Sequence, residues 1–475
     1  MLEGLEIQEY KLSDCIQNKD YRIDTDYYIK IPNKNKNLEY KKIGECLLYS
    51  QYGISIEMNE ENKGYPIYRM NEIHDMLCDL NVDKCADIEE DVFESFQLND
   101  KDVLFNRTNS YDFVGRTGIY YDNDGVKRTF ASYLVKFVPK TYIILPEYLT
   151  TYLNTEQGIL DIKRHARQSI NQTNVNPEEV KEMEIPILSM YLQEKIKDNL
   201  ILANKKRCHA QVLYLDAQKL LLDYLNLNDW QPSNNQINVK SLKDSFMLSG
   251  RMDSEYYQAK YDELDRMIST LPHKKLKDLC ILINHGMQPP YVENGEMRVF
   301  SQKWIKDNEI DYSFVEDSNE PRTNIEFAYA NPEYVCKKND IVHYSVGANI
   351  GFCHTYLSDV PMMPGSFITL IRANENKINP IYLGVVLNSI VGRMQSEKRK
   401  SGTAQPYIYP KDLKEFIIPI LANNVQESIA SKVQESFALK SESKRLLNAA
   451  KKAVEIAISE NEEKALQYIT ENENG

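Results

Sequence analysis

The chain has 475 residues, of which 42% are hydrophobic and 27% are charged, and its formal net charge is −13. This length exceeds one typical core and predicts at least two globular domains, with no apolar run long enough to span a bilayer. The N-terminal segment MLEGLEIQEY has neither the basic start nor the apolar core of a signal peptide, so we expect a cytoplasmic protein without a membrane partner.

The acidic residues concentrate in two segments. Residues 72–102 hold 11 Asp and Glu against Lys84 and Lys101, and residues 459–475 hold five Glu against Lys464. These segments account for the whole negative excess. Basic surfaces can therefore exist elsewhere, and the net charge does not exclude a nucleic-acid partner.

The chain repeats itself once. Arg22–Tyr28 (RIDTDYY) recurs as Arg251–Tyr257 (RMDSEYY) at an offset of 229. Five further matches recur in the same order at an offset of 233 or 234: Lys41 with Lys274, Gly53 with Gly286, Tyr148 and Asn154 with Tyr382 and Asn388, Ile185–Leu188 with Ile418–Leu421, and Gln193 with Gln426. A period this long indicates two similar domains rather than a solenoid. A duplicated fold without functional symmetry is the alternative.

Both copies combine strands and helices. Runs rich in Val, Ile, Tyr and Phe between Asn, Gly and Asp turns predict strands at 101–106, 133–139, 340–344 and 367–372. Residues 148–160 and 382–393 predict one helix in each copy. We therefore expect mixed modules.

A long helix with heptad spacing closes each copy. The positions seven apart, with their companions four later, are Ile196, Ala203, Ala210, Ala217 and Tyr224 with Leu200, Arg207, Tyr214 and Leu221, then Ile429, Ser436, Ser443, Ala450 and Ala457 with Val433, Lys440, Leu447 and Val454. Small residues allow close approach of two helices, whereas the charged residues and serines weaken a homodimer zipper. The simplest interpretation is an antiparallel pair within the chain. The alternative is that each helix packs only on its own domain.

Eight scattered cysteines form no CxxC pair and indicate reduced thiols rather than disulfides. His74, Cys78 and Cys85 form one conceivable ligand group, and a second is listed here: Cys336, His343, Cys353 and His354. Neither has the spacing of a known zinc site, so we expect no metal.

Three short motifs recur in the same order in the two copies. The first copy has Asp102–Arg107 (DVLFNR), Arg167–Gln172 (RQSINQ) and Glu184–Ile187 (EIPI). The second has Asp340–Tyr344 (DIVHY), Ser401–Ile408 (SGTAQPYI) and Phe416–Ile420 (FIIPI). With these motifs each copy resembles a target-recognition domain of a Type I restriction-modification specificity subunit, which reads "gDvL-hxR", a helix, "G-t-x-Q-x-x-I" and "hxIPhP". Gln193 and Gln426 match the family's "Q-x-x-I" entry to the long helix, but the second copy lacks an arginine matching Arg107, so no specific role follows for Arg107.

The resemblance implies a non-catalytic subunit without a cofactor. It would read a bipartite sequence in double-stranded DNA, one half per domain. It would also recruit two methyltransferase subunits and, for cleavage, restriction subunits that carry the motor and nuclease. A structural adaptor subunit of a related phage-defence complex with the same fold is the alternative.

Two segments before the long helices offer side chains for DNA. Base edges need donors and acceptors such as Arg, Gln and Asn, and phosphates need Lys and Arg. The candidates are Lys163, Arg164, Arg167, Gln168, Asn171 and Gln172 in the first copy, and Arg393, Lys398, Arg399, Lys400, Thr403 and Gln405 in the second. Both segments lie at the end of the helix that precedes the "IP" strand, so they occupy equivalent places in the two copies. A solvated basic helix end is the alternative, since cations suit helix C-termini.

The sequence lacks the motifs expected of a methyltransferase or an ATP-driven motor. Gln288–Tyr291 (QPPY) resembles the "(N/D)PP(Y/F)" motif of amino-methyltransferases, but Gln288 is one methylene too long and no Gly-rich cofactor loop accompanies it. Asn379–Tyr382 (NPIY) lacks the second proline. There is also no GxxxxGK[ST] phosphate loop.

The predicted fold class is α+β, with two pseudo-symmetric mixed α/β target-recognition domains separated by an antiparallel two-helix coiled coil. We place the first domain at 1–190, the central helix at 191–227, a linker and the second domain at 228–424, and the C-terminal helix with an acidic tail at 425–475. A 29-residue helix, 196–224, would span roughly 43 Å, or about 13 base pairs between half-site centres.

Overall fold

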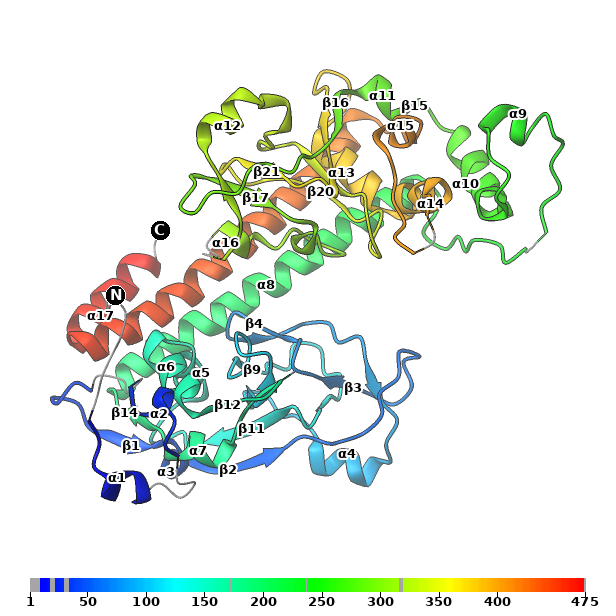
Figure 1. Cartoon of the computed structure of the whole chain (residues 1–475). Coiled ribbons are helices and arrows are strands. Elements are labelled where there is room, and N and C mark those ends of the chain that lie inside the picture. The colour runs from blue at the N-terminus through cyan, green and yellow to red at the C-terminus, as the bar shows by residue number, and fades with distance from the viewer. Residues whose placement is uncertain are drawn as a thin grey trace. The chain divides into compact units, whose positions relative to one another are not determined.

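The computed structural model describes residues 9–17, 22–29, 34–170, 172–235, 237–315, 319–402 and 404–473. The chain forms two compact units (Figure 1). Unit 1 contains residues 1–209 and 439–475, and unit 2 contains residues 210–438. Two long helices, α8 (Met190–Tyr224) and α16 (Asn423–Ser459), contribute residues to both units.

Unit 1 has these other elements: α1 (Leu12–Gln17), α2 (Thr25–Ile29), α3 (Ile43–Cys46), α4 (Glu90–Phe96), α5 (Pro146–Leu153), α6 (Glu156–His165), α7 (Pro177–Glu182), α17 (Glu462–Glu473), β1 (Tyr40–Lys42), β2 (Leu47–Tyr52), β3 (Tyr65–Tyr68), β4 (Ile73–His74), β5 (Leu77–Cys78), β6 (Cys85–Ala86), β7 (Val103–Asn106), β8 (Thr108–Asn109), β9 (Thr117–Ile119), β10 (Thr129–Phe130), β11 (Leu134–Pro139), β12 (Ala166–Gln168), β13 (Thr173–Val175) and β14 (Glu184–Pro186).

Unit 2 has these: α9 (Phe246–Ser249), α10 (Ala259–Ser269), α11 (Leu276–Leu279), α12 (Ile325–Ala330), α13 (Pro380–Asn388), α14 (Ile390–Arg399), α15 (Pro410–Leu413), β15 (His273–Lys275), β16 (Cys280–His285), β17 (Met297–Phe300), β18 (Arg322–Thr323), β19 (Ile341–Tyr344), β20 (Cys353–Thr355), β21 (Met362–Pro364), β22 (Ile368–Ala373) and β23 (Ile417–Pro419).

The main sheets of the two units share the order of four strands. Unit 1 orders its main sheet β2-β11-β7-β9-β5-β4, and unit 2 orders its own β16-β22-β19-β20. In both, the strand that precedes the domain helices pairs antiparallel with two neighbours, one from the start of the copy and one from the "DvL" motif. The four strands expected from the sequence are confirmed as β7, β11, β19 and β22. The α+β class is confirmed with them.

A second, two-stranded sheet joins the ends of each copy. Lys41 of β1 pairs with Ile185 of β14, and Lys274 of β15 pairs with Ile418 of β23. These are the residues that matched in the self-comparison. The repeated sequence therefore marks positions where distant parts of one copy meet.

The single helix expected in each copy was wrong. Each is two helices, α5 and α6 in unit 1 and α13 and α14 in unit 2. Thr155 caps α6 by accepting from Gly158 N at 3.1 Å, and Ser389 caps α14 by accepting from Val391 N at 3.2 Å. A Cβ at Gly158 would lie 2.2 Å from the Tyr152 carbonyl oxygen, so glycine permits the sharp turn between the helices.

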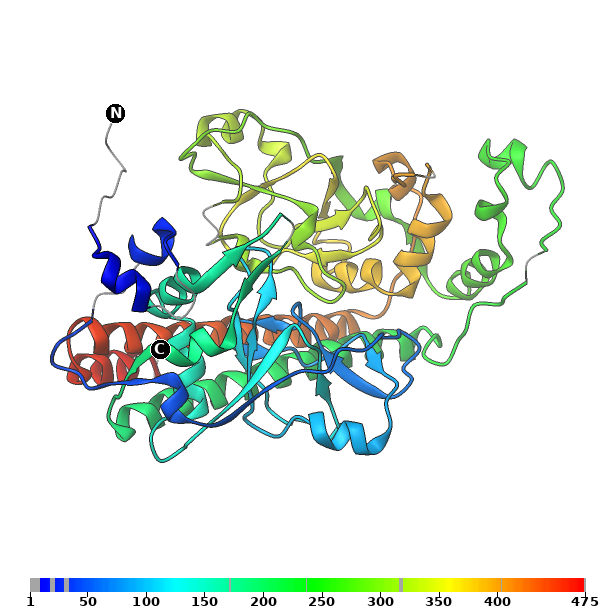
Figure 2. The ribbon, with the colours of Figure 1, turned by 60° about the horizontal axis from the view of Figure 1, so that its bottom comes forward.

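The long helices pack antiparallel on each other within each unit, as the heptads predict (Figures 1 and 2). In unit 1 the Ser443 hydroxyl donates to the Ala203 carbonyl at 2.8 Å, and in unit 2 the Ser436 hydroxyl donates to the Ala210 carbonyl at 2.6 Å. Residue numbers therefore rise along α8 in the direction in which they fall along α16, as in an antiparallel pair. Arg207 leaves the seam and donates to the Cys78 carbonyl at 2.7 Å.

The acidic segment after α16 is not a tail. It forms helix α17, in which Ala465 and Ile469 are fully buried in the core of unit 1. These two apolar residues lie four apart and so share one face of the helix. The glutamates Glu462, Glu463 and Glu471 occupy the remaining faces.

We expect Gly392→Ala to lower the free energy of unfolding by about 1–3 kcal/mol. Its Cβ would lie 2.0 Å from the Leu387 carbonyl oxygen, so α14 would have to shift. Urea unfolding of the full chain measures the effect. Gly365→Ala is the control, because a Cβ there meets nothing closer than 3.4 Å and should change stability by less than about 0.5 kcal/mol. Equal stability of the two variants would contradict the close approach.

Candidate nucleic-acid interface

The first candidate segment is a β-hairpin that follows α6. Ala166 of β12 pairs with Val175 of β13, and the tip closes where Ser169 N donates to the Gln172 carbonyl at 2.8 Å. Gln168 and Gln172 are exposed at this tip. Asn171 lies outside the described residues.

The second candidate segment is a shorter loop that follows α14. Ser401 and Tyr407 form an isolated β-bridge at its base. Gln405 and Lys400 are exposed, and Thr403 lies outside the described residues. The two segments start at equivalent positions, since Ala166 and Lys400 are the C-cap residues of α6 and α14. The expectation that both segments lie at a helix end is confirmed.

Several of the candidate cations bind the protein itself. In unit 1, Lys163 donates to the Val114 carbonyl at 3.0 Å and to the Tyr111 carbonyl, and burial lowers the pKa of Lys163 to about 8. Arg164 donates to the Tyr27 carbonyl at 2.5 Å. Both side chains therefore hold neighbouring segments of unit 1 in place.

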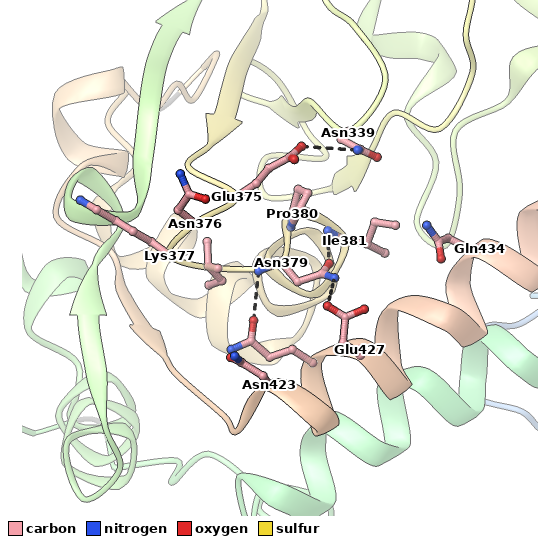
Figure 3. A pocket seen from close by; sticks show the side chains of 12 residues that line it. Asn339, Glu375, Asn376, Lys377, Asn379, Pro380, Ile381, Asn423, Glu427 and Gln434 are labelled. Atoms are coloured by element: carbon pink, nitrogen blue, oxygen red, sulfur yellow. Dashed lines mark hydrogen bonds between the residues drawn. The ribbon is translucent and has the colours of Figure 1, made fainter.

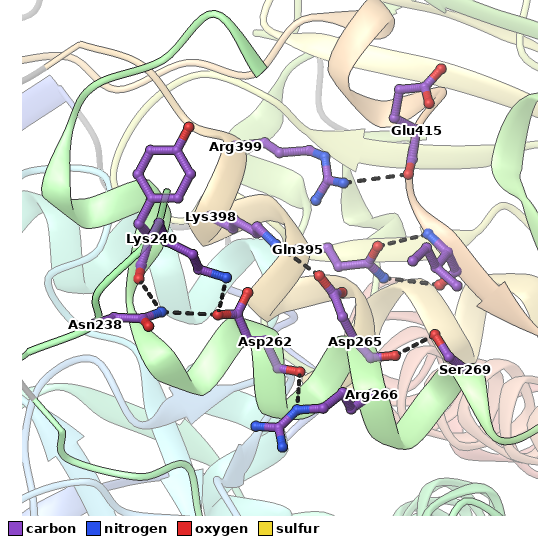
Figure 4. A network of polar contacts seen from close by, with 12 residues as sticks. Asn238, Lys240, Asp262, Asp265, Arg266, Ser269, Gln395, Lys398, Arg399 and Glu415 are labelled. Atoms are coloured by element: carbon purple, nitrogen blue, oxygen red, sulfur yellow. Dashed lines mark hydrogen bonds and ion pairs between the residues drawn. The ribbon is translucent and has the colours of Figure 1, made fainter. Parts of the chain in front are cut away.

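Unit 2 uses its cations in the same way. Lys398 pairs with Asp265 at 2.8 Å and has only a 10% exposed side chain (Figure 4). Arg399 donates to the Glu415 carbonyl at 3.4 Å. Arg393 pairs with Asp307. Of the unit 2 candidates that the structure describes, Lys400 and Gln405 are exposed.

Arg167 is the exposed cation of the first segment. Its side chain is 48% exposed and pairs with Glu179 at 2.9 Å. The Glu179 side chain is only 14% exposed, so this ion pair lies partly inside unit 1.

Sequence reasoning missed a second loop beside each segment. In unit 1, Asn109 of β8 pairs with Thr173 of β13. In unit 2, Gly347 N donates to the Pro406 carbonyl at 2.9 Å. Each partner loop follows the "DvL" strand and is rich in Asn, Ser and Gly, and that composition was the available signal. A pocket of about 200 Å³ lies at this place in unit 2 and is lined by Gly347, Ala348, Ile350, Arg393, Met394, Glu397, Lys400 and Pro406.

The matched glutamines are structural. Gln193 accepts from Leu145 N at 2.8 Å, and Gln426 accepts from Asn379 N at 3.1 Å. Leu145 and Asn379 are the N-caps of α5 and α13, so each glutamine ties a long helix to a domain helix. Asn379 also donates to Glu427 at 3.2 Å beside a polar pocket of about 330 Å³ (Figure 3).

The methyltransferase-like sequences have structural explanations. The Asn379 side chain accepts from Ile381 N at 2.9 Å and from Tyr382 N at 3.1 Å. With Pro380 in the first turn, "NPIY" is a capped helix start. Gln288 is exposed in the loop after β16.

His343, one of the residues considered as a metal ligand, forms hydrogen bonds with serine hydroxyls. His343 is fully buried between the hydroxyls of Ser345 and Ser396, at 3.0 and 3.2 Å, and burial lowers its pKa to about 3. Across the described ranges, no three His, Cys, Asp or Glu side chains gather as metal ligands would. Within those same ranges, no helix is long and apolar enough to cross a bilayer.

Arg107 faces the protein as well. Its guanidinium donates to the Ser132 carbonyl at 3.2 Å and lies over the Tyr52 ring at 5.2 Å. The arginine of the "DvL-hxR" motif therefore packs beside the sheet of unit 1. Ser345 stands at the corresponding place in unit 2.

Comparison with known proteins finds a family model that matches most of the second copy. Residues 271–451 match the family model of the Type I restriction modification DNA specificity domain. The type I restriction enzyme MjaX specificity subunit of Methanocaldococcus jannaschii is 27% identical over 173 residues, which are 34% of this chain. The match spans 40% of that relative's length, less than half.

Solved structures give more distant matches. The S subunit of a Type-I restriction-modification system from M. genitalium is 14% identical, with 92% of this chain and 98% of that chain covered and a TM-score of 0.39. The HsdS subunit of Thermoanaerobacter tengcongensis is 14% identical, with 90% and 98% covered and a TM-score of 0.29. Scores this low support no inference. The family model and the curated relative nevertheless confirm the resemblance: the chain is similar to Type I restriction-modification specificity subunits, and its residues 271–451 match their DNA specificity domain.

Proposed function

We propose that this chain reads a bipartite DNA sequence as the specificity subunit of a Type I restriction-modification complex. Each unit would read one half-site. The chain would position two methyltransferase subunits and, for cleavage, restriction subunits, without carrying out chemistry itself. No cofactor is part of this proposal.

One observation carries the proposal. In both units, an exposed loop with glutamine side chains leaves the C-terminal end of a helix at an equivalent position, and the second of these loops lies inside the stretch that matches the DNA specificity domain. Glutamine can donate and accept together and so can pair with the edge of adenine in the major groove. The proposed DNA contacts are the exposed Arg167, Gln168, Gln172, Lys400 and Gln405.

Exchanging residues 250–424 for the matching domain of a relative should change one half of the sequence methylated and keep the other. The reason is that each unit has its own core and its own exposed loop. The measurement is methylation-sensitive sequencing of DNA modified by the chain with its methyltransferase partner. A change in both halves would show that the domains do not read independently. Complex assembly without any sequence preference would favour the structural adaptor.

Removing seven residues from α8 and the facing seven from α16 should shorten the spacer and keep both half-sites. Deleting 207–213 with 433–439 preserves the heptad phase of both helices. A helix rises 1.5 Å per residue, so the loss of roughly 10 Å corresponds to about three base pairs. The same sequencing assay measures the spacer. An unchanged spacer would contradict a rigid helix pair that sets the distance between half-sites.

Lys398 and Lys400 should respond differently to substitution. Lys398→Met removes the ion pair with Asp265, so we expect lower thermal stability and a nearly unchanged salt dependence of DNA binding. Lys400→Met should leave stability intact and lower the slope of log affinity against log salt by about one unit, because one phosphate contact is lost. Binding at several salt concentrations and thermal melting give both readouts. An unchanged slope for Lys400→Met would place this side chain away from DNA.

A further inference from the structure

The longest sequence match between the two copies contacts the start of the candidate loop in each unit. Arg22–Tyr28 in unit 1 and Arg251–Tyr257 in unit 2 make the same set of contacts. In each, the arginine forms a two-pronged ion pair with the aspartate two residues later: Arg22 Nε and Nη2 reach Asp24 at 2.7 and 2.8 Å, and Arg251 Nε and Nη2 reach Asp253 at 2.8 and 2.5 Å. Such forked pairing fixes the plane of the guanidinium.

The two tyrosines of the motif fix the arginine further. The guanidinium lies over the Tyr27 ring at 4.8 Å in unit 1 and over the Tyr256 ring at 4.7 Å in unit 2. The next tyrosine closes the turn, since the hydroxyls of Tyr28 and Tyr257 donate to the arginine's own carbonyl at 2.7 and 3.0 Å. We name this arrangement of Arg, Asp, Tyr and Tyr the arginine clamp.

The clamp binds the carbonyls at the start of each candidate loop. Arg22 donates to the Ala166 carbonyl at 3.4 Å. Arg251 donates to the carbonyls of Arg399 and Lys400, each at 3.2 Å. Ala166 and Lys400 are the C-caps of α6 and α14, where helix carbonyls lack partners and a cation is favourable.

This hydrogen bond sets the direction in which the chain leaves the helix and enters the candidate loop. A hydrogen bond to a C-cap carbonyl orients the peptide plane shared with the next residue, which here is Arg167 or Ser401, the first residue of the candidate loop. The Arg22 side chain is only 9% exposed and is committed to Asp24 and Ala166, so it is not available to a phosphate. The clamp is alike in the two units, whereas the loops above it differ in sequence and length.

We propose that Arg22 and Arg251 are positioning residues, each of which sets the loop of its own unit and thereby the half-site that this unit reads. The proposal rests on the proposed function. The clamp holds the loop, and the loop's amide side chains meet the bases.

The test uses Arg251→Lys in the full chain, assembled with its methyltransferase partner. Lysine keeps the charge but cannot pair with Asp253 in a fork and also donate to two carbonyls. We expect discrimination at one half-site to fall roughly tenfold or more, with the other half-site and the salt slope unchanged. Arg22→Lys should affect the opposite half-site. Arg266→Lys is the matched control, because Arg266 is exposed on α10 and donates to the Asp262 carbonyl within its own helix.

Hydrogen exchange of the free chain separates the two proposals. We expect the amides of residues 400–408 to exchange faster in Arg251→Lys than in the parent chain. Unchanged exchange would overturn the clamp, whatever the DNA results are. Faster exchange in a chain that shows no half-site preference would overturn the proposed function and leave the clamp standing. A lower salt slope would show that Arg251 contacts phosphate and would overturn the positioning role. If Arg251→Lys does not fold, Asp253→Asn releases the same guanidinium and keeps the arginine.

Discussion

The close contact between α8 and α16 is the constraint on which both units depend. Ala203 and Ala210 are fully buried, and a serine hydroxyl of the other helix reaches each of their carbonyls. At these contact positions, side chains larger than serine and alanine would force the two helices apart. The same helices complete both cores, since Leu200 belongs to the core of unit 1 and Leu221 to that of unit 2. A shift in register along the pair would therefore disturb both cores at once.

Comparison of the two units shows which elements around the candidate site are alike and which differ. The paired strands β1–β14 and β15–β23, the glutamines at the start of the long helices and the arginine clamps agree between the units in partners and geometry. The loops that they hold do not agree. Unit 1 presents a regular hairpin, and unit 2 presents a shorter loop closed by one bridge. A repeated frame with unlike loops suits a molecule that must read two different half-sites from one architecture, as the proposed function requires.

The sequence predicted those features that depend on local pattern. Heptads predicted the helix pair, alternating β-branched and aromatic residues predicted four strands, and the repeat predicted two similar units. The helix break at Asn154 and Thr155 was missed because the apolar pattern continues through it, and only the cap and the crowding at Gly158 show the turn. The internal roles of Lys163 and Lys398 could not be predicted either. Their partners, Val114 and Asp265, lie 49 and 133 residues away along the chain.

These internal roles change the balance of the candidate interface. A run of lysine and arginine at a helix end suggests a phosphate-binding patch, but most of these cations already hold carbonyls, carboxylates or aromatic rings of their own unit. To release one for DNA would cost a buried or half-buried contact, and a phosphate would have to replace it. Among the described residues, Gln168, Gln172 and Gln405 are the exposed amides of these loops, and an amide can both donate to and accept from the edge of adenine. The two loops are therefore better suited to reading bases than to holding the backbone. Under the proposed function, most of the phosphate contacts would have to come from other parts of the chain or from the methyltransferase subunits beside it.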